Sequence, residues 1–206
     1  GDCCMTCSRV DRFSESKQLF IDDYGSYEIS KYVDPVDIIE KGGLFISTCS
    51  IVFRHNILKN YPEYCIKCHV GDYPIQIIAA MKGSVFYIND IMAVYRVERP
   101  LSWVGNLRKG FLNDKYLAGI RSEVKMLQCL CSDYPLYKKN FENRINIYVF
   151  SCCPNRKQNP QFYSKYKKEF KKEIRQLGLK NRIDLFFKTS GCKRLYYVYK
   201  WIKSKL

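Results

Sequence analysis

Asp72 is the residue whose type and surroundings most directly suggest catalysis in this chain of 206 residues. It stands in the sequence Gly71-Asp72-Tyr73-Pro74, which is typical of the first turn of a helix. Backbone N–H groups and the helix dipole at such a position keep a carboxylate ionised near neutral pH. An ionised carboxylate can accept the proton of a substrate hydroxyl while that oxygen forms a new bond. Asp72 is therefore a candidate general base, although helix capping alone would also explain its position.

Charged and aromatic residues near the ends of apolar segments form a second group of candidates. Arg54 and Arg96 each follow such a segment, where a guanidinium can bind a phosphate or pair with a neighbouring carboxylate. Glu98 can bind a hard divalent cation or remain solvated. Trp103, after the break at Pro100, can stack on a sugar ring or pack beneath its own loop.

Eleven cysteines are present, an odd number that favours free thiols in a reducing compartment over a disulfide framework. Cys4 and Cys7, and likewise Cys65 and Cys68, have the C-x-x-C spacing of a four-thiolate zinc site. The segment between the two pairs is much longer than in a zinc ribbon. The second pair with His69 also spells the haem attachment pattern, which requires an exported chain. We therefore expect neither zinc nor haem.

The positive charge is concentrated near the C-terminal end. Lys and Arg outnumber Asp and Glu by 35 to 20, a net charge of +15. Residues 156–206 hold 16 basic and three acidic residues and so carry +13 of that charge. Such a segment is expected to seek an anionic membrane surface, nucleic acid or an acidic partner.

Neither a membrane span nor a signal peptide is visible in the sequence. No apolar run approaches the ~20 residues that cross a bilayer. The first residues lack the basic and apolar regions of a signal peptide. We therefore expect a cytoplasmic protein, which its basic region could bring to the inner face of the membrane.

The elements that must position these residues alternate between strand and helix up to residue 97. The α/β alternation favours a mixed sheet covered by helices. The pattern predicts strands over 3–13, 17–21, 44–53, 84–88 and 91–97, a turn at 22–26, a short helix over 35–40, helical character over 54–59 and a helix over 73–82.

Residues 106–206 are predicted to be mainly helical. Residues 106–142 carry apolar side chains at helical spacing, and a long helix is expected from Asn159-Pro160 to Gly178. The apolar stripe of the long helix consists of Tyr163, Tyr166, Phe170, Ile174 and Leu177. A second basic amphipathic segment covers 192–206. Such stripes can lie in an anionic membrane interface or pack on the rest of the protein.

Four segments in a fixed order carry a resemblance to a known family. They are the strand-like Gly43–Arg54, Tyr61-Pro62-Glu63-Tyr64, the helix start at Gly71-Asp72-Tyr73, and Gly83–Val97 with Tyr95-Arg96 near its end. In this order and spacing they resemble the second half of the catalytic domain of family 2 glycosyltransferases, which have the GT-A fold. The resemblance covers residues 3–105.

The resemblance implies an inverting transfer of a sugar from a nucleotide-sugar donor to a hydroxyl of a glycan or lipid-linked acceptor, in bacterial surface polysaccharide or glycan synthesis. It implies Asp72 as the base, with Tyr73, Arg54, Arg96 and Trp103 binding substrate. It also implies a divalent Mn or Mg ion. Glu98 is a departure from the family, which often has a histidine there that contacts metal or diphosphate. A glutamate can bind a hard divalent cation, but while ionised it cannot donate a hydrogen bond to a diphosphate.

A second departure concerns the nucleotide-binding half of the family's domain. Its Asp-x-Asp metal motif has no counterpart here, because Asp22-Asp23 lies in a predicted turn. We therefore expect this chain on its own to bind a nucleoside diphosphate weakly and to be inactive as a fragment. The expected fold is α/β, with a partial GT-A-like mixed sheet and covering helices over residues 1–105 and a helical, basic region over 106–206. The alternative function is a non-catalytic basic module that binds anionic membrane or nucleic acid, and no recognised motif favours nucleic acid.

Overall fold

The computed structural model describes residues 3–99, 113–189 and 197. Trp103, residues 106–112 and, apart from Tyr197, the predicted segment 192–206 lie outside the described residues.

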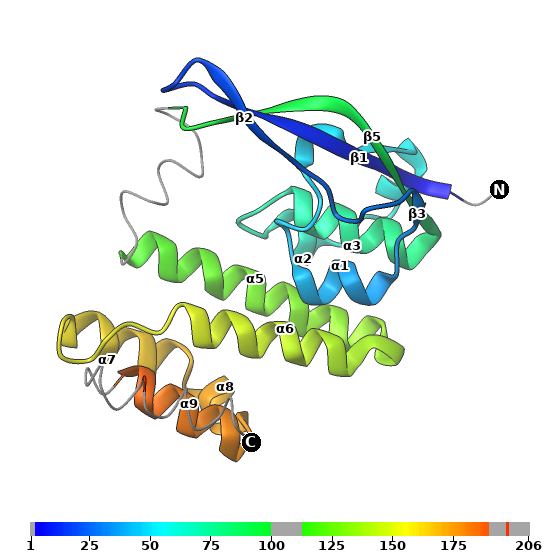
Figure 1. The fold of residues 1–206 in the computed structure, drawn as a ribbon. Coiled ribbons are helices and arrows are strands. Elements are labelled where there is room, and N and C mark those ends of the chain that lie inside the picture. Colours follow the sequence, from blue (N-terminus) through cyan, green and yellow to red (C-terminus); the bar gives the residue numbers. More distant parts are fainter. Residues whose placement is uncertain (1–2, 100–112, 190–196, 198–206) are drawn as a thin grey trace.

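A mixed sheet forms one side of the molecule (Figure 1). Its strand order is β2-β1-β5-β3, and β4 pairs with β1. The long strands β1 and β5 run parallel, and the other pairs are antiparallel. The strands are β1 (Cys3–Ser14), β2 (Leu19–Tyr24), β3 (Lys31–Tyr32), β4 (Val52–Phe53) and β5 (Ser84–Val97). The mixed α/β class expected from the sequence is thus confirmed.

The hairpin of β1 and β2 confirms the first two predicted strands, but the predicted turn at 22–26 is wrong at its start. Asp22, Asp23 and Tyr24 still belong to β2. The reason is a pair of cross-strand ion pairs, Arg12 with Asp22 and Arg9 with Asp23, which hold these residues against β1.

The strands predicted over 84–88 and 91–97 are one continuous strand, β5. The register between β1 and β5 shifts on either side of Arg9, which pairs with Ile91. Irregularities of this kind absorb extra residues without ending a strand. The break expected between the two strands is therefore only a local shift in the pairing of β5 with β1.

The strand predicted over 44–53 is wrong. Only β4 at its end is a strand, and a short 3-10 helix, η1 (Thr48–Ser50), precedes it. The hydroxyl of Ser50 donates to the carbonyl of Ser47 at 2.8 Å. Serine and threonine hydroxyls compete in this way with sheet hydrogen bonds, so an apolar run with Ser47–Ser50 in its middle turns instead of extending.

Helices lie beneath the sheet in successive layers (Figure 1). The first contains α1 (Pro35–Lys41), α2 (Glu63–Ile66) and α3 (Asp72–Lys82), with the 3-10 helix η2 (His55–Leu58) preceding α2. The next contains α5 (Asp114–Asp133) and α6 (Lys138–Ser151), joined through η3 (Pro135–Tyr137). The helices α7 (Pro160–Glu169), α8 (Lys171–Gln176) and α9 (Leu179–Thr189) lie farthest from the sheet. Helices therefore dominate the described part of the C-terminal region, as predicted.

The single long helix predicted from residue 160 to Gly178 is wrong in its continuity, whereas its end is confirmed, because α8 stops at Gln176 and Leu177 caps it. Phe170 leaves helical geometry, with φ −105° and ψ 25°, and separates α7 from α8. Its ring and that of Tyr166 are completely buried, and Leu177 of the predicted stripe is buried as well. Here the packing alternative holds, because burial of these rings against α5 and α6 decides the path of the chain. Beyond Gly178 the chain continues as α9.

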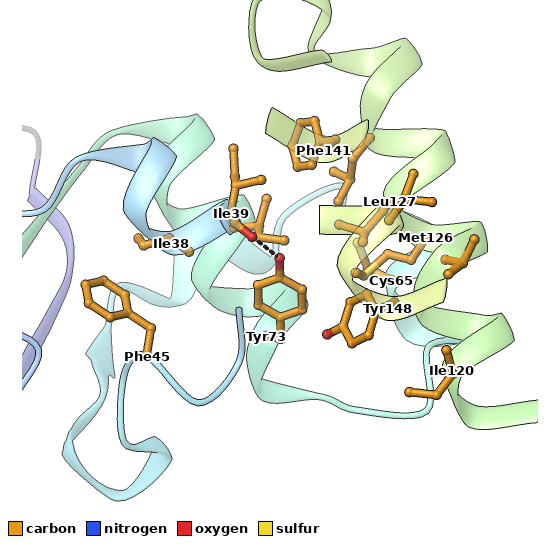
Figure 2. Packing of buried hydrophobic residues seen from close by; sticks show 14 of the residues in the cluster. Ile38, Ile39, Phe45, Cys65, Tyr73, Ile120, Met126, Leu127, Phe141 and Tyr148 are labelled. Carbon is orange, nitrogen blue, oxygen red and sulfur yellow. Dashed lines mark hydrogen bonds between the residues drawn. The ribbon is translucent and has the colours of Figure 1, made fainter. Parts of the chain in front are cut away.

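One continuous buried cluster joins the sheet to all three layers of helices. Figure 2 shows the part of this cluster that lies between α1, α3, α5 and α6. It contains Met5 of β1, Ile77 of α3, Leu127 of α5 and Tyr166 of α7. Residues on both sides of the predicted boundary at 105/106 therefore share one core. Among the described helices, none combines the length and apolar character that crossing a bilayer requires.

Candidate functional site

A pocket of about 530 Å³ opens between the start of α3, the segment before η1, the strand β5 and the helices α5 and α6. Its walls include four tyrosines: Tyr73, Tyr95, Tyr116 and Tyr148. Its charged groups include Asp72, Glu123 and Arg144. A pocket of this size with aromatic walls and a few convergent polar groups has the character of a small-molecule site.

Asp72 is the first residue of α3, one position later than the expected cap, because Gly71 occupies the N-cap. One carboxylate oxygen, Oδ1, accepts the backbone N–H of Tyr73 at 2.8 Å. The other, Oδ2, accepts the hydroxyl of Thr48, the first residue of η1. A carboxylate offers about four acceptor positions, so these two bonds orient Asp72 and leave it able to accept a further donor. The side chain is partly exposed and lines the pocket.

Tyr73 is fixed by its own hydrogen bond beneath the pocket. Its hydroxyl donates to the carbonyl of Ile39 in α1 at 2.7 Å, and its ring lies between α1 and Tyr148 (Figure 2). Gly43 permits this packing, since a Cβ there would lie 3.1 Å from the Cβ of Tyr73. Because its hydroxyl is already bonded, Tyr73 offers a ligand the face or edge of its ring.

Glu123 is a second carboxylate in the pocket, and it is buried in α5. Burial is the largest influence on this group and raises its pKa above the ordinary 4.5. The negative charge of Asp72 acts in the same direction, whereas a hydrogen bond from Tyr148 and the charge of Arg144 oppose it. Burial likewise raises the pKa of Tyr148, whose phenol stays neutral as the donor to Glu123.

Arg144 of α6 supplies the pocket's positive charge. Its guanidinium carbon lies 4.4 Å from the ring centre of Tyr148, and Nη1 donates to the carbonyl of Glu40 at 3.3 Å. Its Nε is buried without a hydrogen-bond partner. Gly42 makes room for this side chain: its φ is +78°, and a Cβ there would lie 2.0 Å from Nη2.

The two carboxylates suit different tasks. Asp72, at a helix N-terminus and partly exposed, is placed to accept a proton from a ligand hydroxyl. Glu123, buried and with a raised pKa, is arranged to share or donate one. Tyrosine rings and a guanidinium between them can pack on a ligand and bond its hydroxyl groups. The arrangement can therefore hold a polyhydroxylated molecule with one hydroxyl directed at Asp72.

The other predicted site residues lie elsewhere. The Nε of Arg54 donates to the carbonyl of Cys3 at 2.7 Å, which ties β4 to the start of β1. Arg96 pairs with Glu15 at 3.3 Å on an exposed strand end. Neither lines the pocket, whereas the neighbouring Tyr95 does. Successive residues of a strand point to opposite faces, which explains why Tyr95 and Arg96 separate.

Glu98 does not sit in a group that resembles a metal site. Its carboxylate accepts the hydroxyls of Ser14, at 2.5 Å, and Ser16, which closes the end of the β1–β5 pair. Its backbone has φ +62°, a left-handed conformation rare outside glycine. Over residues 3–99 and 113–189, no three His, Cys, Asp or Glu side chains gather as ligands would.

The cysteine pairs are arranged as buried thiols. Burial raises the pKa of Cys7 and of Cys65 to about 12 in each case, so both remain protonated near neutral pH. The ten cysteines in the described residues are free. Five of them act as small apolar side chains in the core: Cys4, Cys7, Cys65, Cys152 and Cys153.

Glu123, Arg144 and Tyr148 are pocket residues that sequence reasoning missed. One signal existed for Glu123: it falls on the apolar stripe of α5, between Ile120 and Leu127 at spacings of three and four. An acidic residue on a buried stripe is costly unless it has partners, and so deserves notice in a sequence. Arg144 and Tyr148 carry no comparable signal.

No protein-family model matches this chain, and no curated protein sequence matches it.

Proposed function

We propose that this chain is the acceptor-side part of an inverting glycosyltransferase with a GT-A-like fold, and that Asp72 is its catalytic base. The proposal rests on one observation: the Asp72 carboxylate, at the start of α3, lines a pocket whose walls are rich in tyrosine. The resemblance of residues 3–105 to family 2 glycosyltransferases indicates the reaction, and the pocket is the site at which the acceptor would bind.

The chemistry follows from the position of the base. The acceptor hydroxyl attacks the anomeric carbon of the donor sugar from the side opposite the leaving group, so a new C–O bond forms with inversion. The bond from that carbon to the diphosphate oxygen breaks, and its electron pair leaves with the diphosphate. Asp72 accepts the hydroxyl proton as the new bond forms, when the hydroxyl has become far more acidic.

Two hydrogen bonds aim the base. The Thr48 hydroxyl and the Tyr73 N–H fix the plane of the Asp72 carboxylate. A fixed plane lowers the entropic cost of reaching the reactive geometry. A simple membrane-binding or nucleic-acid-binding module would give this pocket no role, which favours the enzyme over those alternatives.

The variant Asp72→Asn tests the base in the complete natural polypeptide that contains these residues. Loss of a general base costs about 10²–10⁴-fold in rate, so sugar transfer should fall by at least about 10²-fold. Asparagine keeps the size and can still accept the Tyr73 N–H, so the circular dichroism and the thermal midpoint should barely change. Donor affinity should stay within a few-fold, because the proton moves only in the transition state.

Asp114 provides a matched control. It is likewise the first residue of a helix, α5, but it pairs with Lys165 and lies outside the pocket. Asp114→Asn should leave transfer unchanged. Equal losses in the two variants, or full transfer in a folded Asp72→Asn protein, would show that Asp72 is only a structural residue.

A further inference from the structure

The helix α9 carries an exposed apolar stripe that the sequence pattern had not singled out. Leu179, Ile183 and Phe186, spaced by four and three residues, share one face and are 75%, 39% and 66% exposed. The opposite side of α9 is anchored to the protein. Leu185 and Thr189 are buried there, and the Lys188 ammonium donates to the carbonyls of Phe150 and of Ser151, the latter at 3.3 Å.

This anchoring fixes which face points outward. Arg156 adds a further tie, since its backbone N–H donates to the carbonyl of Thr189 at 3.2 Å. Burial of the Lys188 side chain lowers its pKa, which agrees with its inward position. The apolar stripe therefore cannot turn into the core without breaking these contacts.

Exposed basic residues flank the stripe. Lys180 and Arg182 lie beside it in the helix, and both are exposed. The span from α7 through α9, residues 160–189, holds nine basic and three acidic residues. These three helices form the end of the molecule opposite the sheet (Figure 1). A helix with an apolar stripe bordered by cations, at one end of a basic protein, is typical of helices that lie in a membrane interface.

We propose that α9 docks this protein on an anionic lipid bilayer, with the Leu179, Ile183 and Phe186 side chains inserted among the acyl chains and Lys180 and Arg182 at the headgroups. Charge decides among the possible occupants of the stripe. A second copy of this chain, at +15, would bring like charges together. Residues 192–206 carry five basic and no acidic residues, so their binding to the stripe would also bring like charges together. In an anionic bilayer, the acyl chains would cover the apolar stripe and the negative headgroups would pair with the basic residues beside it.

The inference does not depend on the proposed transferase activity, and vesicle sedimentation of the 206-residue chain tests it. The chain should pellet with vesicles of equal parts phosphatidylcholine and phosphatidylserine, and much less with phosphatidylcholine alone. The double variant Leu179→Ser/Phe186→Ser should bind the anionic vesicles at least about tenfold more weakly. Lys180→Gln/Arg182→Gln should weaken binding by about tenfold and reduce its dependence on salt.

Leu136→Ser is the matched control, because Leu136 is 85% exposed but lies in η3, away from α9. It should bind like the unmodified chain. The proposal is overturned if the chain ignores anionic vesicles, or if the double variant binds them as well as the unmodified chain. It is also overturned if the double variant lowers the thermal midpoint strongly or disrupts a dimer without affecting binding, since protein would then cover the stripe. Stronger binding to a single-stranded oligonucleotide than to vesicles, unaffected by the double variant, would favour nucleic acid instead.

Discussion

Asp72 and Glu123 line one pocket but experience different electrostatic surroundings. Asp72 accepts two hydrogen bonds at the start of α3. Glu123 is buried in α5, and both burial and the charge of Asp72 raise its pKa. Glu123 therefore holds its proton to a higher pH than a free glutamate does, which delays the appearance of a second negative charge in the pocket. The same proton gives the folded state a measurable dependence on pH.

The pH dependence of stability should reveal Glu123. Its folded pKa lies above 4.5, so the folded state binds more protons than the unfolded state once the pH exceeds that value. The stability that this group contributes is complete below 4.5 and is lost as the pH rises through the raised pKa. Glu123→Gln cannot ionise, so its unfolding free energy relative to the unmodified protein should increase from pH 4.5 upward. Urea unfolding at a series of pH values measures this difference.

A matched substitution separates this effect from the mere loss of a carboxylate. Glu142 is exposed on α6, and surface substitutions usually change the unfolding free energy by less than about 0.5 kcal/mol. Glu142→Gln is therefore the control. A Glu123→Gln protein whose stability relative to the unmodified chain is constant from pH 4.5 to neutrality would contradict the prediction.

At the scale of elements, a buried ion pair joins α5 to α8. The Arg121 guanidinium donates to both oxygens of Glu173, at 2.7 Å and 3.3 Å, and to Glu169 of α7 at 2.8 Å. Gln128 donates to Glu173 as well, at 2.9 Å. Although burial alone would raise it, the pKa of Glu173 is lowered by these partners. The pair thus holds the small outer helices on the layer of α5 and α6.

Breaking this pair should destabilise the protein far more than breaking a surface pair. Arg121→Met leaves a buried carboxylate without its cation, at a cost of about 3 kcal/mol in unfolding free energy. Lys165→Met breaks the exposed pair with Asp114 and should cost less than about 1 kcal/mol. Chemical denaturation of both variants measures the difference. Similar losses in the two would mean that the buried pair adds nothing beyond surface electrostatics.

The sequence pattern predicted those elements whose ends and faces are determined locally. The helix α3 has Gly71 and Gly83 at its ends, and α1 starts at Pro35 after the capping Asp34. The errors occur where tertiary contacts decide. Phe170 interrupts a helical pattern because its ring is buried, and the run before β4 turns on serine hydroxyls. The periodicity of apolar residues gives no information about these competing interactions.

The candidate site likewise contains residues that the sequence could predict and residues that it could not. Asp72 was predictable because a helix start leaves a local signature. Arg144 was not, since it reaches the pocket only because α6 packs on α1 and because Gly42 leaves space for the guanidinium. A pocket that is formed by helices far apart in the sequence cannot be predicted from a local sequence pattern.

At the scale of the whole molecule, one core connects the sheet to the outer helices. Leu127 of α5 is completely buried in it. Leu127→Ala should therefore lower the unfolding free energy by about 2–5 kcal/mol. Because the core is continuous, thermal unfolding should remain one transition, and the slowest-exchanging amides of α3 and α6 should lose protection by the same factor. Hydrogen exchange with mass spectrometry measures both helices. Two transitions, or loss of protection in α6 alone, would contradict a shared core.

The parallel pairing of β1 with β5 also has a consequence for how the chain reaches this structure. Cys7 pairs with Tyr87, so the two halves of this ladder lie about 80 residues apart. The β1–β2 hairpin can close as soon as both strands leave the ribosome. The other edge of β1 must wait until β5 and every helix before it have been made. During synthesis that edge is an unpaired strand bordered by buried-type side chains such as Met5 and Val10. The growing chain therefore passes through a period in which chaperone binding, or association with a neighbouring nascent chain, competes with folding.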